Sequence, residues 1–158
     1  MNNPVESREE TSKYTDTLED GTSRKWTWAM DAKSVVTSPS PQSPIPHGKG
    51  PLVITGLAWS GRGSITRVDV SVDGGKNWHE ARLAQPGTKM ALTRFYLDIE
   101  WNGQEMFLQS RAHDETGYVQ PTKAELREVR GLNSIYHNNC IQTWWVKSNG
   151  EAENVEIS

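Results

Sequence analysis

Four histidines and one cysteine are the residues of this chain whose types could bind a metal ion or act as nucleophiles. The histidines are His47, His79, His113 and His137. No two of them have the spacing of metal ligands on one element, such as His-x-x-x-His. The best local cluster around a histidine, His113-Asp114-Glu115, is more typical of a strand that ends in a loop than of a catalytic site. The sequence therefore predicts no metal ligands and no cofactor-binding residues in this chain.

Three further motifs are better explained by turns and packing than by chemistry. Asp73-Gly74-Gly75-Lys76-Asn77 lacks the other carboxylates of a calcium loop, so it predicts a hairpin turn. Ser60-Gly61-Arg62-Gly63 lacks the Lys-Ser/Thr of a phosphate loop and precedes a strand, so it predicts another turn. Cys140 stands just before an apolar run and has no evident electropositive partner, so we expect a free, buried thiol.

The composition excludes several classes of protein. Hydrophobic residues make up 34% of the 158 residues, which predicts a modest core. A net charge of −3 argues against a nucleic-acid-binding surface, which needs an excess of basic residues. No apolar run is long enough to cross a bilayer, and residues 1–6 show no signal peptide. Seven tryptophans against two phenylalanines favour large rings in sheet cores and at interfaces.

Alternating apolar residues predict strands along most of the chain. The alternation begins at Trp26, Trp28 and Met30, and it is clearest at residues 68–72, where it predicts one apolar and one solvated face. A segment rich in proline, residues 38–46, predicts a loop. Further strands are expected at residues 52–59, 95–99, 106–112 and 141–146. Residues 123–130 are compatible with a helical turn or with extended chain.

Three dipeptides predict tight turns between these strands. They are Asp73-Gly74, Asn102-Gly103 and Asn149-Gly150. We expect Trp78 and Leu83 on the strand that returns from the first turn, and Val155 and Ile157 on the strand that returns from the last. Gly56 inside its strand predicts a bulge or a close approach of another group to the backbone.

The spacing of these elements predicts the fold class. Roughly seven to nine short strands, separated by turn signals, are typical of an all-β antiparallel sandwich, and no crossover helix is visible. We place the sandwich between Trp26 and Lys147, with extensions at both ends. The first extension, residues 2–22, is polar and must gain its order from another surface.

Several stretches resemble the C-terminal dimerisation domain of the sulfite oxidase family of molybdenum enzymes. They are residues 56–63, residues 67–78 and residues 111–121. Within that family, residues 6–16 and residues 133–144 are similar to the sulfane dehydrogenase members, the SoxC-like subunits. The resemblance covers nearly the whole chain and implies an immunoglobulin-like (E-set) β-sandwich with an extended N-terminal segment.

The resemblance also implies how the chain is organised. Residues 1–25 would be a boundary segment from a missing molybdopterin domain, and residues 26–158 the molybdenum oxidoreductase dimerisation domain. Full-length members hold molybdenum-molybdopterin in that other domain, which supplies a cysteine thiolate to the metal. Cys140 lies in the wrong domain for this ligand, so we expect this chain to bind no cofactor and to lack the catalytic domain. A partial gene product is then expected, and a natural module is the alternative.

Two residue-level expectations follow from the resemblance. Sulfite oxidases place an arginine that binds sulfite in a segment that matches residues 139–143, and no arginine stands there. Because an oxyanion favours a bidentate cation, the substitution favours a sulfane sulfur on a carrier protein over free sulfite. Tyr14 is the counterpart of an active-site tyrosine of the family and our candidate catalytic residue. The other explanation for Tyr14 is packing on the missing domain.

Partners and location are implied in the same way. The family implies a homodimer, a c-type cytochrome subunit as electron acceptor, a sulfur-carrier protein and a periplasmic location, in the oxidation of sulfur compounds such as thiosulfate. The turn at residues 61–63 is expected to face the missing domain. The alternative is a stand-alone immunoglobulin-like protein-interaction domain without redox activity.

Overall fold

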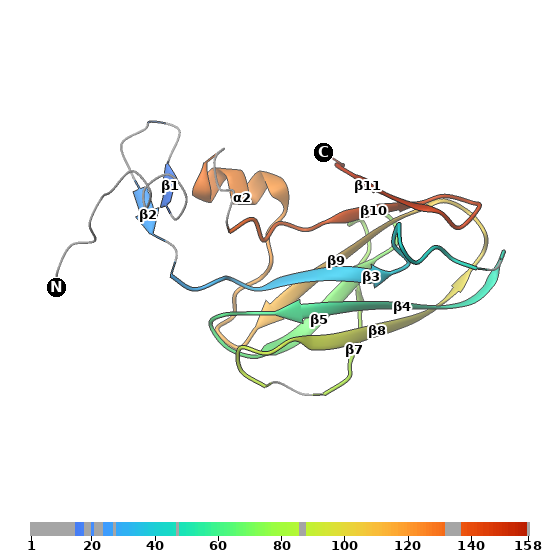
Figure 1. Ribbon diagram of the computed structural model, residues 1–158, viewed down its shortest axis with the longest axis horizontal. Helices are drawn as coiled ribbons and strands as arrows, with labels where there is room; N and C mark the ends of the chain where they lie inside the picture. The colour runs from blue at the N-terminus through green and yellow to red at the C-terminus, as the bar shows by residue number, and fades with distance from the viewer. Residues whose placement is uncertain are drawn as a thin grey trace.

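Two antiparallel sheets pack face to face in the computed structural model (Figure 1). The structure describes residues 15–17, 20, 24–26, 28–46, 48–85, 88–131 and 137–157. Both sheets consist only of antiparallel strand pairs, and among the described residues one short helix lies outside them. The predicted all-β, immunoglobulin-like antiparallel sandwich is confirmed.

The strands divide between the sheets as follows. The four-stranded sheet has the order β3 (Lys33–Ser38), β4 (Gly50–Trp59), β8 (Thr93–Trp101) and β7 (Arg82–Leu83). The five-stranded sheet has the order β11 (Ala152–Val155), β10 (Thr143–Val146), β9 (Met106–Asp114), β5 (Ile65–Ser71) and β6 (His79–Glu80). A separate hairpin, β1 (Thr15–Thr17) with β2 (Arg24–Trp26), lies at the end of the sandwich where the chain enters (Figure 1).

The core lies between the sheets and is built on the long β4–β8 pair. These strands stay in register from Gly50 opposite Trp101 to Ala58 opposite Thr93, so their inward side chains form one continuous row. Gly56 lies against Phe95, and a Cβ atom there would lie 2.1 Å from the Phe95 ring. The close approach predicted at Gly56 is therefore confirmed, and its cause is a buried aromatic ring.

The strand predicted at residues 26–30 is wrong. β2 ends at Trp26, and the next two apolar residues point to solvent, with Trp28 79% and Met30 41% exposed. The strand that enters the sandwich is β3, which the sequence did not predict. Its inward Ser34 is fully buried because the backbone N–H donates to Gln120 Oε1 at 2.8 Å and the hydroxyl lies 2.7 Å from the same atom. Because one of its inward residues is a serine, this strand lacks the apolar alternation that would have predicted it.

One predicted hairpin, and the continuation of another, cross between the sheets instead. The turn at Asn102-Gly103 joins β8 in one sheet to β9 in the other, and the Trp101 indole N–H donates to the Gln104 carbonyl at 2.9 Å to brace it. The return from Asp73-Gly74 pairs β6 with β5 as predicted, but Leu83 then joins β8 in the opposite sheet. The predicted turn at Asn149-Gly150 does close a hairpin, between β10 and β11.

Residues 123–130, for which the sequence left two alternatives, form the helix α2 (Lys123–Arg130). The Thr122 side chain accepts a hydrogen bond from the Glu125 N–H, and the Glu125 carboxylate accepts one from the Thr122 N–H, which is a capping box. Gly131 ends the helix with a positive φ of 73°. In the described parts of the chain, no helix is long and apolar enough to cross a membrane.

Candidate functional site

A cluster of hydrogen-bonded charged side chains lies on the outer face of the five-stranded sheet. The register of β5 and β9 places Asp69 opposite Arg111, and Arg67 opposite His113. Asp69 has no exposed surface, and its carboxylate accepts hydrogen bonds from Arg67 Nε at 2.6 Å and from the Arg111 guanidinium at 3.1 Å. His113 Nε2 lies 2.9 Å away and carries a proton toward Asp69, because a carboxylate only accepts.

Asp69 contradicts the prediction that the alternate face of this strand is solvated. Burial by itself raises the pKa of Asp69, but the hydrogen bonds from Arg67, Arg111 and His113 outweigh burial and hold the pKa below its usual value. The carboxylate therefore stays ionised at neutral pH. Ser71, two residues further along β5, is also fully buried. On this face, the buried Asp69 carboxylate is satisfied by side chains of the chain itself.

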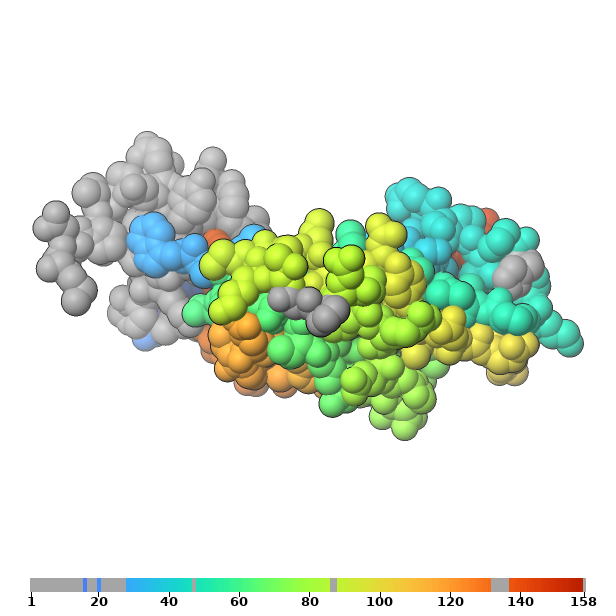
Figure 2. Space-filling view, turned by 90° about the horizontal axis from the view of Figure 1, so that it is seen from below, coloured from blue at the N-terminus to red at the C-terminus, as the bar shows by residue number. Residues whose placement is uncertain are grey.

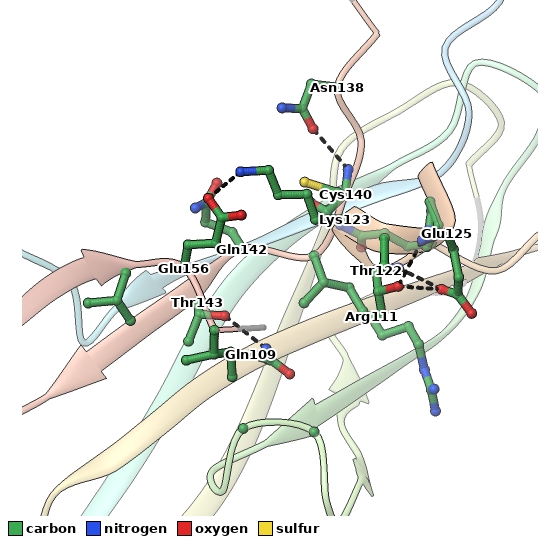
Figure 3. Close-up of a pocket in the computed structure, with 18 of the residues that line it drawn as sticks. Gln109, Arg111, Thr122, Lys123, Glu125, Asn138, Cys140, Gln142, Thr143 and Glu156 are labelled. Carbon is green, nitrogen blue, oxygen red and sulfur yellow. Dashed lines mark hydrogen bonds and ion pairs between the residues drawn. The ribbon is translucent and has the colours of Figure 1, made fainter. Parts of the chain in front are cut away.

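A pocket of about 850 Å³ opens beside this network (Figure 3). Its floor is formed by Gln109 and Arg111 of β9 and by Thr143 of β10, and the Gln109 amide donates to Thr143 Oγ1 at 2.8 Å. One wall is the Gly74–Trp78 turn, and the other is the first turn of α2. Lys123 and Glu156 form an ion pair at the rim, as Figure 3 shows.

Arg111 joins the buried network to the pocket. Its guanidinium carbon lies 4.3 Å from the centre of the Trp78 ring, so the cation is covered by an aromatic face. Its Nε is buried and has no hydrogen-bond partner among the described residues. Gly75 allows the turn to approach, because a Cβ atom there would lie 2.9 Å from Gln109 Oε1. The pocket thus offers fixed charge and apolar surface, and its described lining residues include no nucleophile with an adjacent base.

Cys140 lines the same pocket and is half-buried. Burial raises the pKa of the thiol, and the positive charges of Lys33 and Lys123 compensate only in part. The thiol is therefore protonated at neutral pH. The predicted free thiol is confirmed, but the predicted burial is wrong, because Cys140 is only partly buried and lines the pocket. Among the described residues, no group of three His, Cys, Asp or Glu side chains is arranged to hold a metal ion.

A second polar cluster lies at the end of the sandwich where the N-terminal hairpin enters. Arg130, at the end of α2, donates to Asp16 of β1 at 2.9 Å and also to Asp31. Arg62 extends the chain of charges through its Nε, 2.5 Å from the other oxygen of Asp31. Arg130, Asp16 and Asp31 are buried, whereas the Arg62 side chain is 47% exposed. This charge chain connects four segments of the sequence, which contain Asp16, Asp31, Arg62 and Arg130.

The sequence motifs resolve into structural roles. β9 ends at Asp114, as predicted for His113-Asp114-Glu115, and the Asp114 carboxylate accepts hydrogen bonds from Ser60 Oγ at 2.7 Å and from the Thr116 N–H at 3.0 Å. The Asp73 carboxylate accepts from the Asn77 N–H at 2.9 Å, and the backbone and side chain of Asn77 lower the pKa of Asp73. Both carboxylates hold turns in place.

The candidate catalytic residue Tyr14 lies outside the described residues, so its role stays a prediction. Neither polar cluster was identified from the sequence. Asp69 stands two residues after Arg67, which gave a weak signal for a charge pair. Arg111 and Arg130 gave none, because their partners lie 42 and 114 residues away and only the fold brings them together.

Comparisons with known proteins agree with the resemblance in sequence. The family model of the Mo-co oxidoreductase dimerisation domain matches residues 24–144. Sulfite oxidase of Gallus gallus is 37% identical over 116 residues, which are 68% of this chain and 25% of that protein. Mitochondrial sulfite oxidase of Rattus norvegicus is 33% identical over 122 residues, 72% of this chain and 22% of that protein. The chain thus spans about a quarter of these relatives.

One solved structure is much more similar. The crystal structure of the sulfane dehydrogenase SoxCD from Paracoccus pantotrophus matches with a TM-score of 0.92 and 73% identity. The match covers 98% of this chain and 40% of that one. A family model that matches most of the chain, together with a fold shared at this identity, identifies the family. The chain belongs to the Mo-co oxidoreductase dimerisation domain family, within the sulfite oxidase family of molybdenum enzymes.

Proposed function

We propose that this chain is the dimerisation part of a SoxC-like, molybdenum-dependent sulfane dehydrogenase that acts in the oxidation of sulfur compounds such as thiosulfate. The observation that carries the proposal is the 73% identity, over 98% of this chain, to a structure named as a sulfane dehydrogenase. The sulfite oxidases reach only 37% identity over a shorter part of the chain. The difference favours the sulfane dehydrogenase branch.

The described residues do not fit the molybdenum cofactor. A molybdenum site in this family needs a thiolate, whereas burial raises the pKa of the Cys140 thiol. Cys140 also shares its pocket with the Lys123–Glu156 ion pair and not with other soft ligands. We therefore place the cofactor in another domain of the parent protein and derive no catalytic step through it.

The domain boundary is part of the proposal. We assign residues 1–25 to the segment that leads from the molybdopterin domain, and residues 26–158 to the dimerisation domain. The start of the family match at residue 24 supports this boundary. The contact of Asp16 with Arg130 fixes β1 against α2. We keep Tyr14, which precedes β1 in the sequence, as the candidate catalytic tyrosine. Its test is Tyr14→Phe in the parent enzyme, which should lower turnover and leave the molybdenum content unchanged.

The proposed substrate is a sulfane sulfur held on a carrier protein, and the proposed electron acceptor is a c-type cytochrome subunit in the periplasm. The absence of an arginine from residues 139–143 supports a carrier-bound sulfane over free sulfite. Two copies of the parent protein would associate through this domain, as the name of the family indicates.

The test is a comparison of substrates with the parent protein that contains this chain. We expect reduction of a c-type cytochrome to be faster with carrier-bound sulfane than with free sulfite, and to require molybdenum. A parent protein that oxidises only free sulfite would contradict the sulfane assignment. The chain itself should be a dimer in sedimentation equilibrium, and a monomer at all concentrations would contradict the dimerisation role.

A further inference from the structure

Apolar side chains gather on the outer face of the four-stranded sheet, where a solvated sheet carries polar residues. We call Val35, Val53, Leu57 and Tyr96 the outer band. Val53 is 46% exposed, and the other three are partly exposed. Val35 lies opposite Leu57 across β3 and β4, so the band continues from strand to strand. In Figure 1 no other described strand or helix is drawn over β3, β4 and β8.

Charged residues of β8 lie beside the outer band, as polar residues lie at the rim of an apolar interface centre. Arg94 and Glu100 are exposed on β8, and neither forms an ion pair with a described residue of its own chain. Asp98 lies between them along the strand and is already paired with Arg82 at 3.0 Å. Beside Tyr96, a smaller hollow of about 300 Å³ opens at the β7–β8 edge. Residues of this edge are yellow-green in Figure 2.

We propose that the outer face of the four-stranded sheet is the surface through which two copies of this chain associate, around a two-fold axis that crosses β8 at Leu97. The inference rests on the proposed dimerisation role and adds where the interface lies. The family description supplies the occupant, a second copy. The positions of Arg94 and Glu100 on β8 determine where the axis lies.

Arg94 and Glu100 stand three residues on either side of Leu97. A two-fold axis in the plane of the interface, perpendicular to the strands at Leu97, stacks the two β8 strands in opposite directions. Arg94 of each copy then faces Glu100 of the other, so two ion pairs form across the interface. On β4, Ile54 lies opposite Leu97, so Val53 of one copy lies over Thr55 of the other at the centre of the interface.

The other large faces are less suited to a second copy. On the five-stranded sheet, the Asp69 network is buried under the chain's own side chains, and Trp78 already covers Arg111. At the hairpin end, the buried contact of Arg130 with Asp16 joins the sandwich to the entering N-terminal segment. Among the described residues, the four-stranded sheet places the exposed Val53 beside Arg94 and Glu100, two charges of opposite sign that form no ion pair within the chain.

The experiment measures the dimer dissociation constant of the full chain by sedimentation equilibrium. We expect Arg94→Glu and Glu100→Arg each to weaken the dimer by roughly tenfold or more, because like charges then face each other. The double variant, with both charges reversed, should restore the dimer. Val53→Asp, at the centre, should weaken it at least as much. Lys76→Glu is the matched control, a charge reversal at an exposed position in the turn between β5 and β6. It should leave the dimer dissociation constant unchanged.

Far-ultraviolet circular dichroism and thermal melting establish that each variant is folded. If the wild-type chain is a monomer, the proposed dimerisation role fails first. If the wild type is a dimer and all three single variants stay dimeric, the proposed surface is wrong while the dimerisation role stands. A third outcome is that Val53→Asp separates the two copies while the Arg94→Glu/Glu100→Arg double variant fails to recover the affinity that the single charge reversals lose. In that case the surface is right and the axis at Leu97 is wrong.

Discussion

The outer faces of the two sheets hold their charges in opposite ways. On the five-stranded sheet, Asp69 is fully buried and bonded to Arg67, Arg111 and His113. On the four-stranded sheet, the Arg82 and Asp98 side chains are 68% and 67% exposed. A buried charge that loses its partner is costly, whereas an exposed pair contributes little. The first face therefore stabilises the fold, and the second is available for association.

Removal of the Asp69 carboxylate should have the largest effect on stability. Asp69→Ala leaves Arg111 partly buried without its carboxylate, so we expect the free energy of unfolding to fall by about 3 kcal/mol. Urea unfolding at neutral pH measures the loss. The dissociation constant of the remaining folded dimer should not change, because Asp69 lies on the face away from the proposed interface. A loss no larger than that of Asp98→Ala would contradict the comparison.

Acidification should act on the same face. The pKa of Asp69 is lowered from 3.8 in the folded chain, so its contribution to stability is fully present above that value. This contribution is lost as the pH falls below 3.8 and through the folded-state pKa. Its size is about 1.4 kcal/mol for each unit by which folding lowers the pKa of Asp69. Urea unfolding at acidic and neutral pH measures the slope. Asp69→Asn should reduce it, and an unchanged slope would show that other carboxylates account for acid unfolding.

Loss of the Trp78 ring should have an intermediate effect. Trp78→Ala removes the aromatic cover from the Arg111 guanidinium, which lies 4.3 Å from the ring centre. We expect a loss of about 1 to 2 kcal/mol in the free energy of unfolding. Trp78→Phe keeps an aromatic face and is the control, so it should lose less. Equal losses in the two variants would mean that the Trp78 ring stabilises the chain through something other than Arg111.

The sequence predicted the strands whose inward residues are apolar and failed where those residues are polar. β8 alternates clearly because Phe95 points into the core, whereas β4 is an almost continuous apolar run that contains the inward Ile54 and the outward Val53. β3 was missed because its buried Ser34 is satisfied by Gln120, 86 residues away. The failure at residues 26–30 has the opposite cause. Trp28 and Met30 are spaced like the buried face of a strand, but both are exposed. Periodicity reports residue type, and burial follows it only where the core is apolar.

Cross-strand partners and sheet membership could not be predicted from local pattern. The turn at Asn102-Gly103 has the composition of a hairpin, yet it joins two sheets because β8 pairs with β4. The Asp69 network depends on Arg111 and His113, which lie 42 and 44 residues further along the chain. The resemblance to the family did predict the fold, because it compares the whole pattern and not each element.

Asp98→Ala should have the smallest effect on stability and sharpens the comparison most. It removes the same carboxylate as Asp69→Ala, also paired with an arginine and also on an outward strand face. Because both members of the Arg82–Asp98 pair are exposed to water, Coulomb attraction and lost side-chain entropy nearly cancel. We expect a melting temperature within error of the wild type. Asp98 lies next to the proposed axis, so the variant should instead change the dimer dissociation constant. A clear loss of stability with no effect on association would reverse the roles assigned to the two faces.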